Sequence, residues 1–170
     1  MTVYRLVTAT ERTYNTLMDN HLTAYVMVGA PGAGKSTYAK KLAETENAVI
    51  ISGDDVRREL YGDSSIQGSW VQIWDRIEEL VSGSCGLSVI LDGTHYRKDY
   101  REEAISLLRS YGYLRVEAVV LNPSLATCLS RNSQRKRHVP DYVIKEMHEK
   151  LQTSLKTIGN EDFDSINYVL

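Results

Sequence analysis

An eight-residue segment, GAPGAGKS at 29–36, constrains the fold of this chain more than any other feature. It fits the pattern GxxxxGK[ST] and follows a short apolar run, AYVMV at 24–28, that is typical of a strand buried on both faces. The residues after it, KSTYAKKLAET at 35–45, predict a helix. A strand, a glycine-rich turn and a helix in this order indicate a phosphate-binding loop in a parallel α/β sheet.

The rest of the chain alternates between apolar runs and segments with helical periodicity. Further strands are predicted at 48–52, 87–91, 114–121 and 166–170. Helices are predicted at 8–20, 70–81, 98–110 and 141–157. This order predicts one α/β domain over residues 1–170, with the three-layer sandwich of the P-loop NTPases: a parallel sheet of about five strands with helices on both faces.

Hydropathy and net charge limit which compartment and which binding partners we expect for this chain. No apolar run approaches the roughly 18 residues of a membrane span, and the N-terminal segment MTVYRLVTATERTY is too polar for the core of a signal peptide. We therefore expect a cytoplasmic protein that does not bind a membrane. The formal net charge of −2 provides no general attraction to nucleic acid, although a local basic stripe is compatible with it.

The predicted phosphate-binding loop indicates ATP as a ligand. Its glycines allow successive backbone N–H groups to point at phosphates, and the helix that follows adds the positive end of its dipole. Lys35 is expected to reach the β- and γ-phosphates, and Ser36 to bind Mg²⁺ through its hydroxyl. The residues expected to bind the nucleotide are Gly29, Ala30, Pro31, Gly32, Ala33, Gly34, Lys35, Ser36 and Thr37, with Arg131 and Arg135 from a later segment.

Two aspartates and an arginine follow the strand predicted at 48–52. Asp54 or Asp55 can accept the proton of an attacking hydroxyl, and Arg57 can hold an anionic group of the acceptor. An aspartate at this place can instead serve only as a helix N-cap. Because ligands of open α/β sheets bind beyond the carboxyl ends of the strands, we expect these side chains to lie near the phosphate-binding loop.

A further carboxylate, Asp92, follows the strand predicted at 87–91. Its place is that of a Walker-B-like aspartate, which predicts that it lies near Mg²⁺ and orients metal-bound water. His95, three residues later, can take part directly or serve only as a hydrogen-bonding group.

Basic residues gather in a segment of about 129–140 that we interpret as a lid. Arg131 and Arg135 are four residues apart, which predicts that they share one helical face. Two guanidinium groups over the triphosphate could stabilise transition-state charge, as an arginine finger in cis does. The alternative is a solvated basic surface or an RNA-binding run, for which Lys136 and Arg137 are suited.

Four motifs carry a resemblance to a known family: GAPGAGKST, GDDVRREL, LDGTH and SRNSQRKRHVPDYVIKEM. In this order they resemble the kinase domain of bacteriophage-type 5′-hydroxyl polynucleotide kinases and of related small AAA and zeta-toxin-like kinases. The resemblance covers roughly residues 24–152. It implies an adenylate-kinase-like P-loop fold with an arginine-bearing lid, and ATP and Mg²⁺ as nucleotide and metal.

The resemblance also implies roles for single residues. Lys35 and Ser36 match the family's ligands of ATP and Mg²⁺. Asp54 matches the general base, and Arg57, three residues later, matches the arginine that contacts the acceptor phosphate. The strand-end aspartate and the lid arginine of the family are matched by Asp92 and Arg135.

The resulting interpretation is a Mg²⁺-dependent ATP phosphotransferase that acts on a hydroxyl, with a 5′-hydroxyl of a polynucleotide or nucleotide as the leading acceptor. Gly53 stands where the polynucleotide kinases have a basic residue, and families with the same lid include small-molecule, sugar-nucleotide and seryl-tRNA kinases. A metabolite kinase and an ATP-binding or ATP-hydrolysing regulator therefore remain as alternatives. We expect no obligate protein partner.

Overall fold

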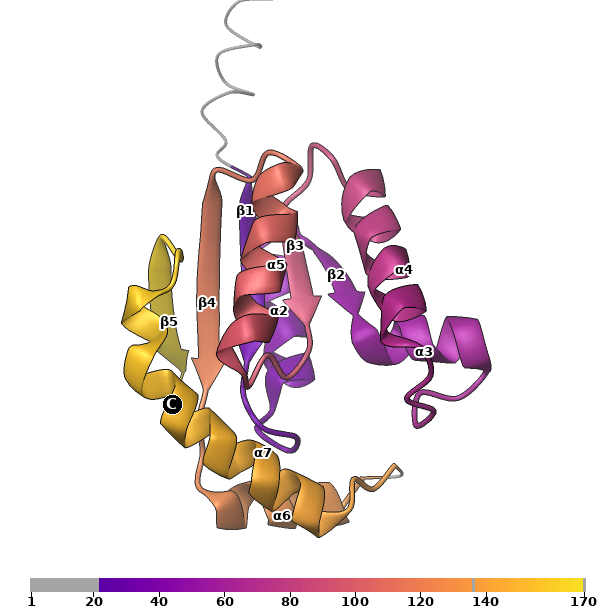
Figure 1. Ribbon diagram of the computed structural model, residues 1–170, viewed down its shortest axis with the longest axis vertical. Coiled ribbons are helices and arrows are strands. Elements are labelled where there is room, and N and C mark those ends of the chain that lie inside the picture. The colour runs from indigo at the N-terminus through magenta and orange to yellow at the C-terminus, as the bar shows by residue number, and fades with distance from the viewer. Residues whose placement is uncertain (1–21, 136, 170) are drawn as a thin grey trace, which may run out of the picture.

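The computed structural model describes residues 22–135 and 137–169, so the helix expected at 8–20 lies outside the described residues. Five parallel strands form one sheet in the order β2-β3-β1-β4-β5 (Figure 1). They are β1 Thr23–Val28, β2 Val49–Ser52, β3 Val89–Asp92, β4 Arg115–Leu121 and β5 Ser165–Val169. Each of the five predicted apolar runs forms one of these strands, and the predicted fold class is confirmed.

Helices cover both faces of the sheet. They are α2 Lys35–Glu46, α3 Gly53–Tyr61, α4 Trp70–Gly83, α5 Lys98–Ser110, α6 Leu125–Ser133 and α7 Asp141–Ser154, with a 3₁₀ helix η1 at Leu155–Asn160. In Figure 1, α5 lies in front of the sheet and α2 behind it. This arrangement follows from right-handed crossovers, because the chain leaves β1 toward one edge and later returns past β1 to β4.

The core lies between these layers. All six residues of β1, the central strand, are buried, as expected for a strand with helices on both faces. In α4 the buried residues are Ile73, Ile77 and Val81, whereas Trp70 is 46% exposed and stacks on Trp74. No helix among the described residues is both long enough and apolar enough to cross a membrane.

The register of the sheet determines where the functional segments meet. Ser52, the last residue of β2, pairs with Asp92, the last residue of β3, so Asp92 and the start of α3 lie at the same edge. The phosphate-binding loop follows the carboxyl end of β1 at this edge. Figure 1 shows α6 and the first turns of α7 beyond the same ends of the strands.

Candidate active site

The phosphate-binding loop, residues 29–36, is held by its own backbone and by the loop after β3. The Gly29 N–H donates to the Thr94 carbonyl at 2.9 Å, and the Lys35 Nζ donates to the Ala30 carbonyl at 2.9 Å. Lys35 is only 8% exposed. Burial lowers the pKa of Lys35 to about 8, although the carboxylate of Asp92 acts in the opposite direction. The ammonium group therefore lies inside the curl of the loop and close to Asp92.

Ser36 and Asp92 provide oxygen ligands of the kind that Mg²⁺ prefers. Ser36 lies close enough to Asp92 that its hydroxyl acts to lower the pKa of that carboxylate. Burial raises the pKa of Asp92, and the contacts with Ser36 and Lys35 oppose that shift. Among the described residues no group of three His, Cys, Asp or Glu side chains could hold a metal by itself. One hydroxyl and one carboxylate fit a Mg²⁺ ion that takes its other ligands from phosphates and water.

Asp54 lies in the first turn of α3, which begins directly after β2. Its Oδ1 accepts a hydrogen bond from Arg57 Nη2 at 2.5 Å, and its Oδ2 accepts one from Arg137 Nη1 at 2.7 Å. Burial acts to raise the pKa of Asp54, but these two guanidinium groups outweigh it and hold the pKa below its usual value. The N-cap residue is Ser52, and no side chain caps this helix end, so the capping alternative for Asp54 is wrong.

The neighbouring aspartate has a different environment. Asp55 Oδ1 accepts a hydrogen bond from Arg58 Nη1 at 2.5 Å, and both of these side chains are more than half exposed. Asp54 is bonded to an arginine of a distant segment, whereas the partner of Asp55 lies one turn along the same helix. The two carboxylates are adjacent in sequence but have different bonding partners in the structure.

Arg131 and Arg135 do not share a helical face, so this prediction is wrong. α6 ends at Ser133, and Arg135 lies beyond the helix. The buried side chain of Asn132 ends the helix here: its amide donates to the Val139 carbonyl at 2.8 Å and accepts from the Val139 N–H at 3.0 Å. These two bonds fold the following segment back on the helix.

The two arginines nevertheless lie at the same site. Arg131 Nη1 donates to the Ala33 carbonyl of the phosphate-binding loop at 3.0 Å. Arg135 is close enough to Lys35 that its charge adds to the effect of burial in lowering the pKa of Lys35. Arg131 thus supports the loop backbone, and Arg135 places a guanidinium near its lysine.

His95 and Arg101 hold the loop after β3 in place. The Met27 carbonyl can only accept, so His95 Nδ1 carries the proton of their 2.8 Å hydrogen bond. Burial lowers the pKa of His95 to about 4, which keeps the imidazole neutral. Arg101, fully buried, donates to the His95 carbonyl at 3.0 Å and forms an ion pair with Glu161 at 2.6 Å. This geometry supports the hydrogen-bonding role for His95.

Sequence reasoning missed three contributors to the site. Arg137, the Thr94 carbonyl and Arg101 each act through a partner that is distant along the chain. The motif pattern placed Arg137 only in a basic run. No local signal pairs Arg101 with Glu161, because 60 residues separate them.

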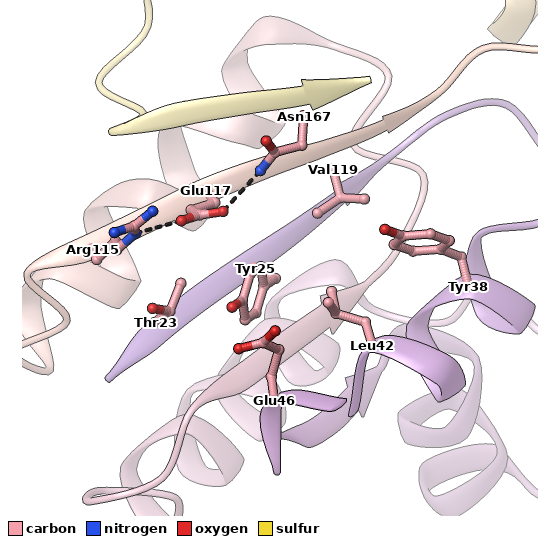
Figure 2. Close-up of a pocket in the computed structure, with 9 residues that line it drawn as sticks. All are labelled: Thr23, Tyr25, Tyr38, Leu42, Glu46, Arg115, Glu117, Val119 and Asn167. Carbon is pink, nitrogen blue, oxygen red and sulfur yellow. Dashed lines mark hydrogen bonds and ion pairs between the residues drawn. The ribbon is translucent and has the colours of Figure 1, made fainter. Parts of the chain in front are cut away.

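A hollow of about 450 Å³ is lined by residues of β1, α2, β4 and β5 (Figure 2). It includes Thr23 and Arg115, the first residues of β1 and β4, and so begins at the opposite ends of the strands. Glu117 forms an ion pair with Arg115 and accepts a hydrogen bond from Asn167 at 2.8 Å. Figure 2 shows these three side chains, Arg115, Glu117 and Asn167, bonded to one another.

Comparison with known proteins finds similarity to kinases and to a chain of an RNA repair complex. An L-seryl-tRNA(Sec) kinase from Methanococcus maripaludis is 29% identical over 143 residues, which cover 75% of this chain and 52% of the relative. A chain of the Pnkp1/Rnl/Hen1 RNA repair complex has the same fold, with a TM-score of 0.67 at 23% identity over 79% of this chain and 45% of that one. The chain thus spans about half the length of these two proteins.

A smaller protein shares the fold over nearly its whole length. A gluconokinase from Sinorhizobium meliloti 1021 matches with a TM-score of 0.52 at 19% identity, over 88% of this chain and 82% of the other. The model of one family, described as AAA domain, matches residues 25–154, which include the phosphate-binding loop, Asp54, Asp92, Arg131 and Arg135. This match extends over most of the sequence, and the chain therefore belongs to the AAA domain family and has the fold of its P-loop kinases.

Proposed function

We propose that this chain is a Mg²⁺-dependent ATP phosphotransferase that moves the γ-phosphoryl group to a hydroxyl, with a 5′-hydroxyl of a polynucleotide or nucleotide as the leading acceptor. One observation carries the proposal. The phosphate-binding loop and the pair formed by Asp54 and Arg57 meet at the same edge of the sheet. A nucleotide and an acceptor can therefore be bound side by side, as transfer in line requires.

The reaction makes one bond and breaks one. The acceptor oxygen attacks the γ-phosphorus, the bond from that phosphorus to the β–γ bridging oxygen breaks, and ADP leaves with the electron pair. Asp54 takes the proton of the hydroxyl, because it is the carboxylate at the acceptor side of the loop. Arg57 orients the acceptor through an anionic group, and its own position is fixed by a 3.2 Å bond from Nε to the Ser64 carbonyl.

The nucleotide is held on the other side of the reacting phosphorus. The backbone N–H groups of residues 29–36 bind its phosphates, Lys35 contacts the β- and γ-phosphates, and Arg135 stabilises charge on the transferred group. Ser36 and Asp92 would hold Mg²⁺, which when bound neutralises charge on the β- and γ-oxygens. Arg131 acts from behind the loop by binding its backbone at Ala33.

The name of one relative supports an acceptor that is linked to a nucleic acid, although the hydroxyl in that name belongs to a seryl group and not to a 5′ end. The relative from Methanococcus maripaludis is a kinase of a tRNA-linked seryl group. Two arginines on Asp54 also favour an acceptor that carries negative charge, as polynucleotides do.

Incubation with Mg²⁺ and γ-labelled ATP identifies the acceptor directly. The panel contains 5′-hydroxyl RNA, 5′-hydroxyl DNA, nucleosides and sugar nucleotides, with Lys35→Met as the inactive control. We expect label at the 5′ end of an oligonucleotide. If only a sugar nucleotide is labelled, the proposed acceptor is wrong, but the reaction is still phosphoryl transfer to a hydroxyl. Release of inorganic phosphate without any labelled acceptor contradicts the proposal and identifies a hydrolysing regulator.

A further inference from the structure

Arg137 contacts the proposed base of the reaction, whereas the sequence indicated for it only a place in a basic or RNA-binding run. Its Nη1 lies 2.7 Å from Asp54 Oδ2, across 83 residues of sequence. Arg57 Nη2 occupies the other oxygen, Oδ1, at 2.5 Å. Each oxygen of this carboxylate is thus bonded to a guanidinium group, an arrangement that stabilises the charged carboxylate and opposes its taking up a proton.

The two arginines differ in how firmly they are held. Arg57 is 18% exposed and has a second bond, from Nε to the Ser64 carbonyl. Arg137 is 34% exposed, and within the described part of the chain its guanidinium bonds to Asp54 alone. One of its five N–H donors makes that bond, so the others remain able to bind a second anion. Arg137 is therefore the arginine that can change partners.

Charged groups of both signs surround Asp54. Besides Arg57 and Arg137, the charges of Lys35 and Asp92 act on this carboxylate from α2 and β3. Two further carboxylates lie in the same field, because the charge of Asp55 acts on Asp92 and the charge of Arg137 acts on Asp63. A phosphate binds a planar guanidinium through two oxygens, whereas Asp54 binds Arg137 through one. Exchange of a half-exposed carboxylate for a phosphate is therefore favourable for Arg137.

We propose that Arg137 is a positioning residue that exchanges Asp54 for a phosphate of the acceptor, and that this exchange frees an oxygen of Asp54 to take the proton of the hydroxyl. The inference rests on the proposed function and adds a residue and a selection step to it. The base becomes available when an acceptor with a phosphate beside its hydroxyl is bound. With an acceptor that lacks this phosphate, both oxygens of Asp54 remain bonded to Arg57 and Arg137.

The test compares two acceptors that differ only in this phosphate: a 5′-hydroxyl nucleoside 3′-phosphate and the matching nucleoside. Arg137→Ala and Arg137→Lys are each measured with both acceptors. Arg58→Ala is the matched control, because it breaks an exposed arginine–aspartate pair of the same helix and removes the same charge. We expect Arg137→Ala to lower kcat/KM for the phosphorylated acceptor by at least about tenfold, mostly through KM.

The same variant should leave kcat/KM for the nucleoside unchanged or higher, and Arg137→Lys should restore part of the activity on the phosphorylated acceptor. The control Arg58→Ala should resemble the wild type with both acceptors. An equal loss with both acceptors shows a merely structural role and overturns the inference, as does unchanged activity of Arg137→Ala. If the wild type labels neither these acceptors nor any other hydroxyl, the proposed function itself fails.

Discussion

Replacing Gly32 by alanine tests the close approach of the phosphate-binding loop to α6. A Cβ atom at Gly32 would lie 2.3 Å from the carbonyl oxygen of Cys128, well inside van der Waals contact. Gly32 also has a φ of 83°, in the left-handed region that residues with a Cβ rarely adopt. Alanine at this position therefore meets both backbone strain and a backbone atom that belongs to a helix.

The magnitude follows from these two effects. The left-handed conformation costs about 1–2 kcal/mol, and forcing a methyl group into a packed contact costs about 1–3 kcal/mol more. Gly62 supplies the control, because its φ is 77° and a Cβ there would meet nothing within 4 Å. Gly62→Ala should lower the free energy of unfolding by about 1–2 kcal/mol, and Gly32→Ala by roughly 2–5 kcal/mol.

Urea unfolding followed by circular dichroism measures both free energies in the same conditions. In thermal unfolding, 1 kcal/mol corresponds to about 2–4 °C in a chain of this size, so the two variants should be resolved. If Gly32→Ala is no less stable than Gly62→Ala, the Cys128 carbonyl of α6 does not lie against the phosphate-binding loop at Gly32. The support that Arg131 gives to the loop would then lose its structural basis.

Three further predictions concern single side chains of the site. Lys35→Met keeps the volume of the side chain and removes its ammonium group, so less than about a tenth of the turnover should remain in a phosphoryl-transfer assay while the melting temperature stays within a few degrees. Arg135→Lys keeps the charge and loses the planar fork, so turnover at saturating substrates should fall at least about a hundredfold at both low and high salt; a change only in the salt dependence of acceptor binding identifies a docking surface instead. His95 has a lowered pKa of about 4 in the folded chain, so its contribution to stability is complete above the unfolded pKa of about 6.5 and is lost as pH falls toward 4. His95→Asn, which tolerates the positive φ of 37° at this position, should show a smaller loss of stability between pH 7 and pH 4 than the wild type, as measured by urea unfolding.

The parts of the fold that could be predicted depend on local patterns. The loop at 29–36 is recognisable because its chemistry needs glycines, a lysine and a hydroxyl at fixed spacing between a strand and a helix. The five strands are recognisable because burial on both faces requires continuous apolar runs. The place of Asp92 could be predicted from the strand that it ends, because a polar residue at the carboxyl end of a parallel strand lies at the edge of the sheet where ligands bind.

The parts that could not be predicted depend on contacts between distant segments. Spacing alone placed Arg131 and Arg135 on one helix, but Asn132 bonds to Val139 and ends α6 between them. The bond between Asp54 and Arg137 requires the segment after α6 to reach the start of α3, which no local pattern indicates. The helix α3 is only nine residues long and buries one residue, Val56, so it offers few apolar positions from which a helix could be predicted.

Asp54→Asn, measured for ATP binding and for phosphoryl transfer in the same preparation, tests the central claim most directly. The amide keeps the shape of the side chain and removes its ability to take a proton. We predict near-normal ATP affinity by isothermal titration calorimetry and a loss of transfer of about two to four orders of magnitude, with Asp55→Asn close to the wild type in both. Full turnover of Asp54→Asn, or an equal loss in Asp55→Asn, would contradict the assignment of Asp54 as the base of a kinase.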